Sequence, residues 1–307
     1  MSGKALTATS LDGILPLVAK GKVRDLYEIN TNVLLFIATD RISAYDVIMA
    51  NGIPHKGHLL TTITAHWFQV LSNAFPSLQT HFLTLDLPSP IVQDPSLCQQ
   101  LQDRSMQVRK LRILPIEAIV RGYITGSAWS EYKETKTVHG ESFDVELQES
   151  APFPNGPIYT PSTKAPAGEK DENITRAQAA ALIGTKHAAR VEELALQLYT
   201  AAAAYASERG IIIADTKFEF GVDEKTEDVV LVDEVLTPDS SRFWDKVRYA
   251  VGKAQESFDK QFLRDWLSEK KLRGKEGVEM PPDVIENTWR RYMDAYERLT
   301  GKVWTKP

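Results

Sequence analysis

Positively charged side chains are concentrated near the start of the chain, in Lys20-Gly21-Lys22-Val23-Arg24. In an extended strand alternate residues lie on the same face, so Lys20, Lys22 and Arg24 are expected side by side. Cations this close repel one another unless an anion or water lies between them, and Gly21 allows a ligand to approach the backbone closely. The pattern is typical of a phosphate-binding strand, although a solvated strand face explains it at least as well.

A second group of charges combines acids with a lysine. Asp215, Lys217 and Glu219 alternate along a predicted strand and therefore share one face. The next predicted strand, residues 229–236, carries Asp233, and a short turn between the strands would place Glu219 opposite it. Facing carboxylates destabilise a sheet, but a divalent cation reverses this, and Mg²⁺ is typically held by one or two carboxylates plus substrate phosphates. The pattern predicts a magnesium site, while an acid after an apolar strand is also a common structural feature.

Further polar stretches suit the binding of an anion. In residues 237–242, Arg242 offers a planar pair of donors to carboxylate or phosphate, and Ser241 and its serine neighbour add hydroxyls. Residues 121–129 place an arginine, two glycines and a serine just after a predicted strand, and residues 40–46 are also polar after a strand. Each stretch has the composition of an ordinary turn as well.

The spacing of apolar and turn residues predicts the elements that must position these groups. Strands are expected at 23–29, 33–39, 105–112, 116–123, 211–221 and 229–236, and helices at 59–74, 176–183, 186–208, 258–271 and 283–299. The proline-rich stretches 76–100 and 150–168 are expected to be loops. Strands and helices do not alternate strictly, so an α+β fold is favoured over a doubly wound sheet.

Composition limits the classes of function. The chain has 307 residues, enough for two domains or one large lobed domain. Its net charge of −5 gives no global positive field for nucleic acid or anionic lipid, so an anion site must be a local cluster. The single cysteine, Cys98, excludes an internal disulfide. The longest strongly apolar run, residues 33–38, is far shorter than the ~20 residues of a membrane span, and no signal peptide is evident, so the cytoplasm is the expected compartment.

The common nucleotide-binding fingerprints are absent from the sequence. No G-x-G-x-x-G occurs, and the stretch from Gly52 to Gly57 has the glycine spacing of a P-loop but is followed by His58 where lysine is required. A nucleotide site in this chain would therefore have to be built in another way.

Longer motifs resemble those of a known enzyme family. The motifs are G-K-V-R-D-x-Y (21–27), T-D-R-I-S-A-Y-D (39–46), V-R-G-Y-I-T-G-S-A-W (120–129), D-T-K-F-E-F-G (215–221) and D-E-V-L-T-P-D-S-S-R-F-W (233–244). Taken together and in this order, they closely resemble the phosphoribosylaminoimidazole-succinocarboxamide synthases, or SAICAR synthetases, above all the fungal monofunctional form. The resemblance spans nearly the whole chain and is weakest around residues 142–160.

The resemblance implies an ATP-dependent ligase of purine biosynthesis. Such an enzyme joins L-aspartate to the carboxylate of carboxyaminoimidazole ribonucleotide (CAIR) and releases ADP and phosphate. An acyl phosphate is the expected intermediate, because a carboxylate is a poor acyl donor. The implied fold is α+β with two lobes, 1–113 and 114–307, an N-terminal lobe distantly like that of protein kinases, and ATP in the cleft between them. A monomer is expected, with Mg²⁺ as cofactor.

The resemblance also implies roles for individual residues. ATP is expected to be bound by Gly21, Lys22, Val23, Arg24, Leu114, Ile116, Glu117, Lys217 and Glu219, with residues 114–117 presenting their backbone to adenine. Mg²⁺ is expected at Glu219 and Asp233. The other substrates are expected to be bound by Asp40, Ser43, Asp46, Arg121, Ser127, Lys164, Asp215, Ser241 and Arg242.

Two other functions were weighed against this one. A protein kinase would need H-R-D-x-x-x-x-N and D-F-G after the adenine-binding segment, and the sequence has neither. A non-catalytic nucleotide-binding module would not require turnover that depends on aspartate. Release of ADP that needs both the ribonucleotide and L-aspartate distinguishes the ligase from both alternatives.

Overall fold

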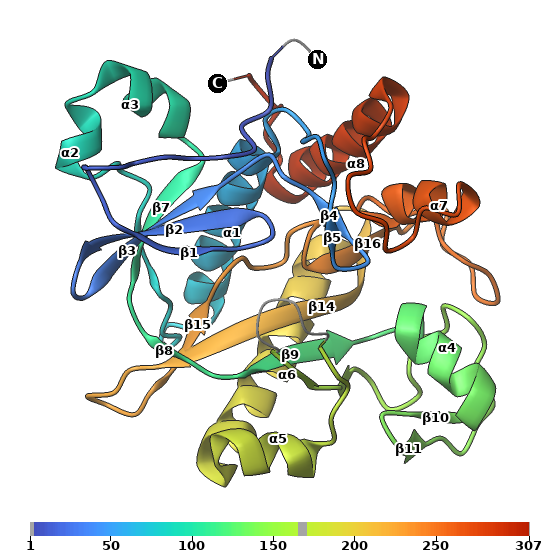
Figure 1. The fold of residues 1–307 in the computed structure, drawn as a ribbon. Coiled ribbons are helices and arrows are strands. Elements are labelled where there is room, and N and C mark those ends of the chain that lie inside the picture. The colour runs from blue at the N-terminus through green and yellow to red at the C-terminus, as the bar shows by residue number, and fades with distance from the viewer. Residues whose placement is uncertain (1–2, 165–170, 307) are drawn as a thin grey trace.

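Two antiparallel sheets form the framework of the chain (Figure 1). The computed structural model describes residues 3–164 and 171–306. The first sheet has the strand order β1-β2-β3-β7-β6, and all of its strands precede residue 110. These strands are β1 (Leu17–Lys20), β2 (Arg24–Asn30), β3 (Val33–Ala38), β6 (Phe82–Thr84) and β7 (Ser105–Arg109).

The second sheet is organised around its long strand β14. The main path is β12-β9-β14-β15, with β8 and β16 also paired to β14 and β13 paired to β9. Its strands are β8 (Arg112–Ile113), β9 (Ile116–Arg121), β12 (Ile158–Tyr159), β13 (Ser162–Thr163), β14 (Ile211–Val222), β15 (Val229–Val232) and β16 (Ser241–Asp245). Two small hairpins lie outside both sheets: β4 (Ser43–Ala44) with β5 (Val47–Ile48), and β10 (Thr137–Val138) with β11 (Glu141–Ser142).

Helices pack around these sheets, and the C-terminal part of the chain forms the helices α7 and α8 (Figure 1). The longer ones are α1 (Lys56–Ala74), α6 (Thr185–Ser207) and α8 (Pro282–Thr300). The shorter ones are α2 (Ser89–Val92), α3 (Pro95–Leu101), α4 (Gly126–Thr135), α5 (Arg176–Ile183) and α7 (Gln261–Glu269). Within the described residues, none of these helices combines the length and the apolar character needed to cross a membrane.

One large apolar cluster joins the two sheets. Helix α1 packs against the first sheet, and helix α6 packs against β14 and β9 of the second. Trp67 of α1, Phe218 of β14 and Tyr292 of α8 are fully buried in this same cluster. Because a close-packed core has little free space, side chains from distant parts of the sequence are held at fixed positions around it.

The α+β fold and the longer elements agree with the sequence predictions. The predicted helices correspond to α1, α5, α6, α7 and α8, and the predicted hairpins to β2–β3 and β14–β15. The prediction of loops is wrong in part, because residues 76–100 contain β6, α2 and most of α3, and residues 150–164 contain β12 and β13. Residues 165–168 of the second stretch lie outside the described residues. Helix α4 and strand β16 are not predicted. Among the missed strands, β12, β13 and β16 are short and depend on pairing with β9 or β14, which local composition does not reveal.

A close approach at Gly122 positions the end of β9. The buried hydroxyl of Tyr199, from α6, donates a hydrogen bond to the carbonyl of Ile213 at 2.5 Å. A Cβ atom added at Gly122 would lie only 2.0 Å from that hydroxyl oxygen. Glycine is therefore required at this position for packing, since any larger residue would displace the tyrosine.

We predict that Gly122→Ala lowers the free energy of unfolding by about 1–3 kcal/mol, because overpacking forces the buried ring to move. Adding Tyr199→Phe removes the clashing oxygen and should recover part of that loss, although the ring carbon at 2.9 Å remains tight. Urea denaturation of both variants and of Tyr199→Phe alone checks this. Losses that simply add in the double variant would contradict the proposed clash.

Candidate functional site

The cationic segment near the N-terminus is a hairpin turn and not one strand face. Strand β1 ends at Lys20 and β2 begins at Arg24, so residues 21–23 form the turn between antiparallel strands. The prediction that Lys20, Lys22 and Arg24 share a face is therefore wrong. Lys20 is exposed on β1, and Lys22 is exposed at the tip, where its ammonium lies 2.5 Å from the carboxylate of Asp46.

Main-chain groups of this turn are already hydrogen-bonded within the fold. The N–H of Gly21 donates to the carbonyl of Arg24 at 2.7 Å, so it is not free for a phosphate. The guanidinium of Arg41 donates to the carbonyls of Gly21 and Lys22 at 3.0 and 3.2 Å, and it pairs with buried Asp25 at 2.6 Å. Arg41 belongs to the second motif but was not selected from the sequence. It fixes the turn that carries Lys22.

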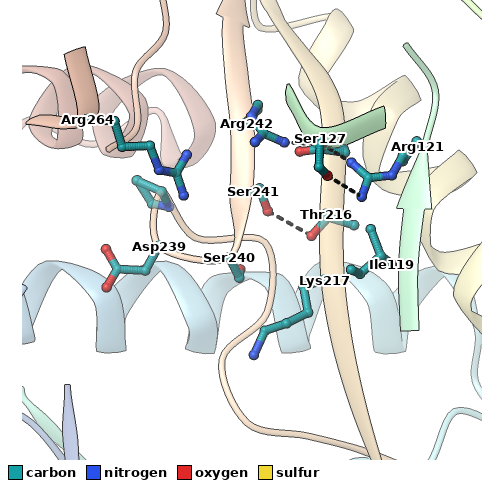
Figure 2. A pocket seen from close by; sticks show the side chains of 12 residues that line it. Ile119, Arg121, Ser127, Thr216, Lys217, Asp239, Ser240, Ser241, Arg242 and Arg264 are labelled. Atoms are coloured by element: carbon teal, nitrogen blue, oxygen red, sulfur yellow. Dashed lines mark hydrogen bonds and ion pairs between the residues drawn. The ribbon is translucent and has the colours of Figure 1, made fainter. Parts of the chain in front are cut away.

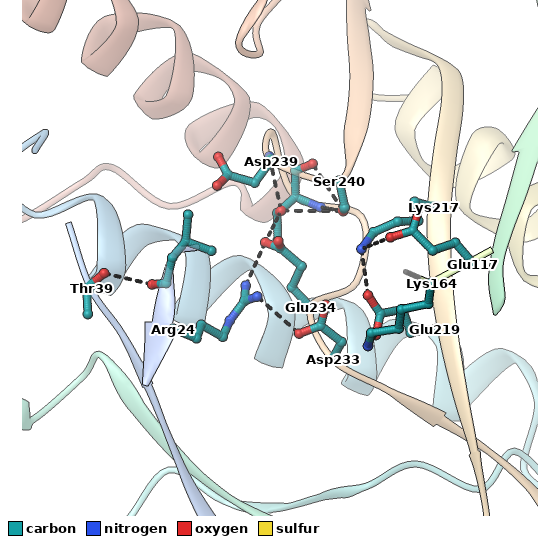
Figure 3. Close-up of polar contacts among 12 residues, drawn as sticks. Arg24, Thr39, Glu117, Lys164, Lys217, Glu219, Asp233, Glu234, Asp239 and Ser240 are labelled. Carbon is teal, nitrogen blue, oxygen red and sulfur yellow. Dashed lines mark hydrogen bonds and ion pairs between the residues drawn. The ribbon is translucent and has the colours of Figure 1, made fainter. Parts of the chain in front are cut away.

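Arg24 joins the first sheet to the segment that follows β15 (Figure 3). Its Nη1 lies 3.0 Å from Asp233 Oδ1, and its Nη2 lies 2.7 Å from Glu234 Oε2. The carbonyl of the neighbouring Val23 accepts hydrogen bonds from the N–H and the hydroxyl of Thr39. Burial acts to lower the pKa of Arg24, but the two carboxylates outweigh it and raise that pKa. In the free protein this guanidinium therefore holds two acids.

Lys217 and Glu219 lie at the centre of a second charge network, on β14 (Figure 3). Lys217 Nζ lies 2.6 Å from Glu219 Oε1 and 3.0 Å from Glu117 Oε1, and Lys164 pairs with the other oxygen of Glu219. Burial acts to raise the pKa of Glu219, but the two lysines outweigh it and hold that pKa at about 2. Glu219 is therefore fully charged at neutral pH and forms ion pairs with both lysines.

The predicted opposition of Glu219 and Asp233 is wrong by one residue. In the observed register Glu219 pairs with Val232, and Asp233 follows the end of β15 in a left-handed conformation with φ of 61°. Burial raises the pKa of Asp233 to about 6, while Arg24 opposes the shift and Glu219 adds to it. The two carboxylates thus still influence one another, although they are not a cross-strand pair.

These carboxylates fit a magnesium ion that is shared with a ligand. Across residues 3–164 and 171–306, no three or more His, Cys, Asp or Glu side chains are grouped so as to hold a metal. Mg²⁺ commonly takes only one or two carboxylates from the protein and completes its shell with phosphates and water. Asp233 keeps a raised pKa even beside Arg24, so a further cation next to it would be favourable.

The segment expected to face adenine lies where β8 leads into β9. The N–H of Leu114 donates to a carbonyl of β14 at 2.9 Å, and the carbonyl of Pro115 accepts from the N–H of Lys164 at 3.1 Å. Ile116 and Glu117 pair with β13. Several N–H and carbonyl groups of this segment are therefore hydrogen-bonded within the fold. A contact with adenine would have to use the N–H or carbonyl groups of the segment that make none of these hydrogen bonds.

A cavity of about 230 Å³ lies between β9, β14 and the loop before β16 (Figure 2). Asp215, on its wall, lies 3.0 Å from Nη1 of Arg121 and also pairs with Arg242. The hydroxyl of Ser127 accepts a hydrogen bond from Arg121 at 3.4 Å, and Ser241 also lines the cavity. The structure thus brings together residues that the sequence suggested separately, from three different motifs.

Cations outnumber acids around this cavity. Arg264 of α7 points toward it, and Lys217 also lines it (Figure 2). The guanidinium of Arg264 forms no hydrogen bond or ion pair to another residue in the described part of the chain. No motif marked Arg264, because it lies inside a predicted helix and only the packing of α7 brings it to the site. The cavity can therefore attract an anion.

The residues selected from the second motif do not form one group. Asp40 is buried, accepts a hydrogen bond from the N–H of Gly57 at 2.9 Å and pairs with Arg104 at 3.1 Å. Asp40 thus anchors the start of α1, and it is not among the residues that line the cavity around Asp215. Ser43 lies in β4, and Asp46 lies in the exposed β4–β5 turn.

Comparison with known proteins identifies the family. The family model described as SAICAR synthetase matches residues 17–281. The phosphoribosylaminoimidazole-succinocarboxamide synthase of Saccharomyces cerevisiae is 56% identical over 309 residues, which covers 98% of this chain and 99% of the relative. The enzyme of the same name from Schizosaccharomyces pombe is 54% identical over 306 residues, with 98% and 99% coverage.

The fold agrees as closely as the sequence. A solved structure described as SAICAR-synthase from Saccharomyces cerevisiae complexed with SAICAR matches with a TM-score of 0.89 and 55% identity, covering 98% of this chain and 100% of that chain. The similarity thus runs through both sheets and through the cavity. The chain therefore belongs to the SAICAR synthetase family, in its fungal monofunctional type, whose members are ATP-dependent ligases that join L-aspartate to CAIR in purine biosynthesis.

Proposed function

We propose that the cavity around Asp215 binds the anionic groups of the ribonucleotide. The observation that carries this proposal is that Arg121 and Arg242 share the single carboxylate of Asp215, so positive charge remains in excess. Arg264 adds another guanidinium, and serine hydroxyls add donors. Forked guanidinium donors suit carboxylate and phosphate. A relative that is 55% identical is described in complex with SAICAR, which supports a ribonucleotide site in this fold.

ATP is assigned to the space between the β1–β2 turn and the charged face of β14. Lys22 is the exposed cation at the tip of that turn, and Lys217 is the cation on β14. On binding, phosphate oxygens would take over part of the positive charge that Asp46 and Glu117 now neutralise. Mg²⁺, when bound, would be held by Glu219 and Asp233 and would supply charge neutralisation for the phosphates.

Ligation requires that the ribonucleotide carboxylate be activated, because its direct leaving group would be oxide. One of its oxygens attacks the γ-phosphorus of ATP, the bond to the bridging oxygen breaks, and an acyl phosphate and ADP result. The amine of L-aspartate, after loss of its ammonium proton, then attacks the carbonyl carbon. Phosphate leaves with the electrons of the C–O bond, and the nitrogen releases a second proton to phosphate or solvent as the amide forms. The lysines and arginines of the site orient these anionic reactants and stabilise the charge that develops.

We infer that ATP lies between an N-terminal lobe, residues 1–113, and a C-terminal lobe, residues 114–307. The ion pairs of Arg24 with Asp233 and Glu234 cross this boundary and support it. A monomer and a cytoplasmic location remain proposals that go with this assignment. Release of ADP only when CAIR and L-aspartate are both present tests the whole assignment, because a kinase or a binding module would not need aspartate.

We predict that Arg242→Lys lowers kcat/KM for the ribonucleotide by about 10-fold or more, since the planar two-donor fork is lost while the charge is kept. Steady-state kinetics with each substrate varied in turn check this. Arg248→Lys is a matched control, because that arginine is exposed and pairs with Glu256 at the surface. Unchanged kinetics for CAIR in Arg242→Lys would disprove the assignment.

We predict that Asp233→Asn raises the Mg²⁺ concentration needed for half-maximal activity without lowering the melting temperature of the free protein. The charged form of Asp233 is disfavoured in the fold, as its raised pKa shows, so an amide of the same shape is tolerated.

Glu219→Gln should weaken the use of Mg²⁺–ATP as well but also destabilise the free protein, because Lys217 and Lys164 lose their shared partner. Titration of activity with Mg²⁺ and calorimetry of the free proteins measure both effects. Loss of the melting transition in Asp233→Asn would indicate a structural role instead.

We predict that Lys22→Ala weakens the binding of ATP more than that of adenosine, because the lost contact is to the phosphate chain. The difference from wild type should shrink at high salt, which screens exposed charges. Lys20→Ala serves as the control, since Lys20 is exposed on β1 away from the tip of the turn. Calorimetric titration at low and high salt measures all of these. Equal losses for both ligands would point to a general distortion of the turn.

A further inference from the structure

Asp239 is a buried carboxylate for which the assigned reaction provides no role. Its side chain is 1% exposed, and it lies in the loop of residues 237–240 that leads into β16. Asp239 and the next residues in the chain, Ser240, Ser241 and Arg242, line the cavity assigned to the ribonucleotide (Figure 2). Any group that fixes Asp239 therefore also fixes one wall of that cavity.

Three side chains from separate segments converge on this carboxylate. Lys56 Nζ lies 2.8 Å and Lys260 Nζ lies 3.1 Å from Asp239 Oδ2, and the Tyr292 hydroxyl donates to Oδ1 at 2.7 Å. Lys56 begins α1, Lys260 precedes α7, and Tyr292 lies in α8. Lys56 is also the lysine of the Gly52–Gly57 stretch, and in the fold it begins α1 and pairs with Asp239.

The energetic consequence is that the loop has very little freedom to move. The side chain of Lys56 is 0% exposed and that of Lys260 is 9% exposed. If either ammonium group left the carboxylate of Asp239, little water could solvate it instead. Separating such a pair leaves uncompensated buried charges, which is strongly unfavourable. Burial acts to raise the pKa of Asp239, but Lys260 and Lys56 outweigh it and hold that pKa below its usual range, so the ion pairs persist at neutral pH.

The other end of the loop is tied to the strand that carries the site. The N–H of Lys217 donates to the carbonyl of Ser240 at 2.9 Å, and the hydroxyls of Thr216 and Ser241 lie 2.8 Å apart. Arg242, which lies opposite Asp215 in the pairing of β14 with β16, forms an ion pair with that carboxylate. The position of this wall relative to β14 thus depends on contacts on both sides of the loop. Asp239 makes the contacts on the side that faces the helices.

We propose that Asp239, held by Lys56, Lys260 and Tyr292, is a positioning residue that sets Ser241 and Arg242 at the correct distance from the ribonucleotide. Asp239 itself belongs to the lining of the cavity, but its carboxylate is 1% exposed and is taken up by these three partners, so it acts through its neighbours in the loop. The inference rests on the proposed assignment of the cavity. It makes the helices α1, α7 and α8, which lie outside the sheets, part of the apparatus that determines affinity for the ribonucleotide.

The first test removes one hydroxyl. Tyr292→Phe should raise KM for CAIR by about 3- to 10-fold, the effect of losing one ordinary hydrogen bond while both ion pairs of Asp239 remain, and leave kcat and KM for ATP unchanged. Tyr205→Phe is the matched control, because its hydroxyl is also part-buried and bonds to His66 and to the carbonyl of Leu299, away from the cavity. A KM for CAIR that is unchanged in Tyr292→Phe, or raised equally in Tyr205→Phe, overturns the proposal.

The second test separates positioning from stability. Asp239→Asn leaves two buried ammonium groups without a counterion, so its melting temperature should fall. The triple variant Lys56→Met, Lys260→Met, Asp239→Asn removes those charges as well and should recover most of the melting temperature. If Asp239 positions the loop, KM for CAIR stays raised in the recovered triple variant. A return of KM to the wild-type value together with the melting temperature would make the role purely structural and overturn the proposal.

The Arg242→Lys variant, measured in the same assay, separates the assignment of the cavity to the ribonucleotide from the positioning role of Asp239. A raised KM for CAIR in Arg242→Lys with an unchanged KM in Tyr292→Phe removes the positioning role and leaves the cavity assignment intact. No change in either variant removes the cavity assignment and the positioning role with it. An increase in both, with Tyr205→Phe at the wild-type value, supports the proposal.

Discussion

Charged groups can lie buried at the centre of this protein because each is matched by an opposite charge. An isolated ion in the interior costs several kcal/mol, so cations and acids are stable there only in contact. Asp215 lies between Arg121 and Arg242, and Arg24 lies between Asp233 and its neighbour. These pairs connect elements from distant parts of the chain, and the positions of the site residues depend on them.

Strand β14 is the element on which these pairs converge. Its alternation places Asp215, Lys217 and Glu219 toward the site, while Phe218 and Phe220 lie in the main core. Neighbours on both sides, β9 on one and β15 and β16 on the other, supply the partner charges or the loops that carry them. Since one strand serves both the core and the site, core packing holds the residues that β14 contributes to the site.

The distribution of charge suits substrates that are all anionic. The chain as a whole carries a net charge of −5, yet the cavity around Asp215 is lined by several arginines and a lysine. A local excess of cations attracts anions over short distances, while the acidic remainder discourages non-specific binding to polyanions. In the free protein the acids beside Arg24 and Lys217 neutralise these cations, and they are also the groups that a magnesium ion prefers.

Much of the site could be predicted from the sequence because its residues lie in short motifs on regular strands. The shared face of Lys217 and Glu219 follows from alternation alone, and Arg121, Asp215 and Arg242 each belong to a motif with a recognisable composition. The family resemblance added the reaction. Errors arose where a strand was assumed to continue, since the chain reverses at residues 21–23 and a run of alternating cations cannot reveal this.

The sequence by itself determined the α+β class, the longer elements, the family and the motif residues that gather at the cavity. Only the tertiary structure decided that Glu219 pairs with Val232 and not with Asp233, because register depends on contacts along two whole strands. It also decided that Arg264 enters the cavity and that Lys56 lies against the loop before β16. Both residues sit in ordinary helices, and nothing local distinguishes them. Their roles arise from the packing of those helices around the common core.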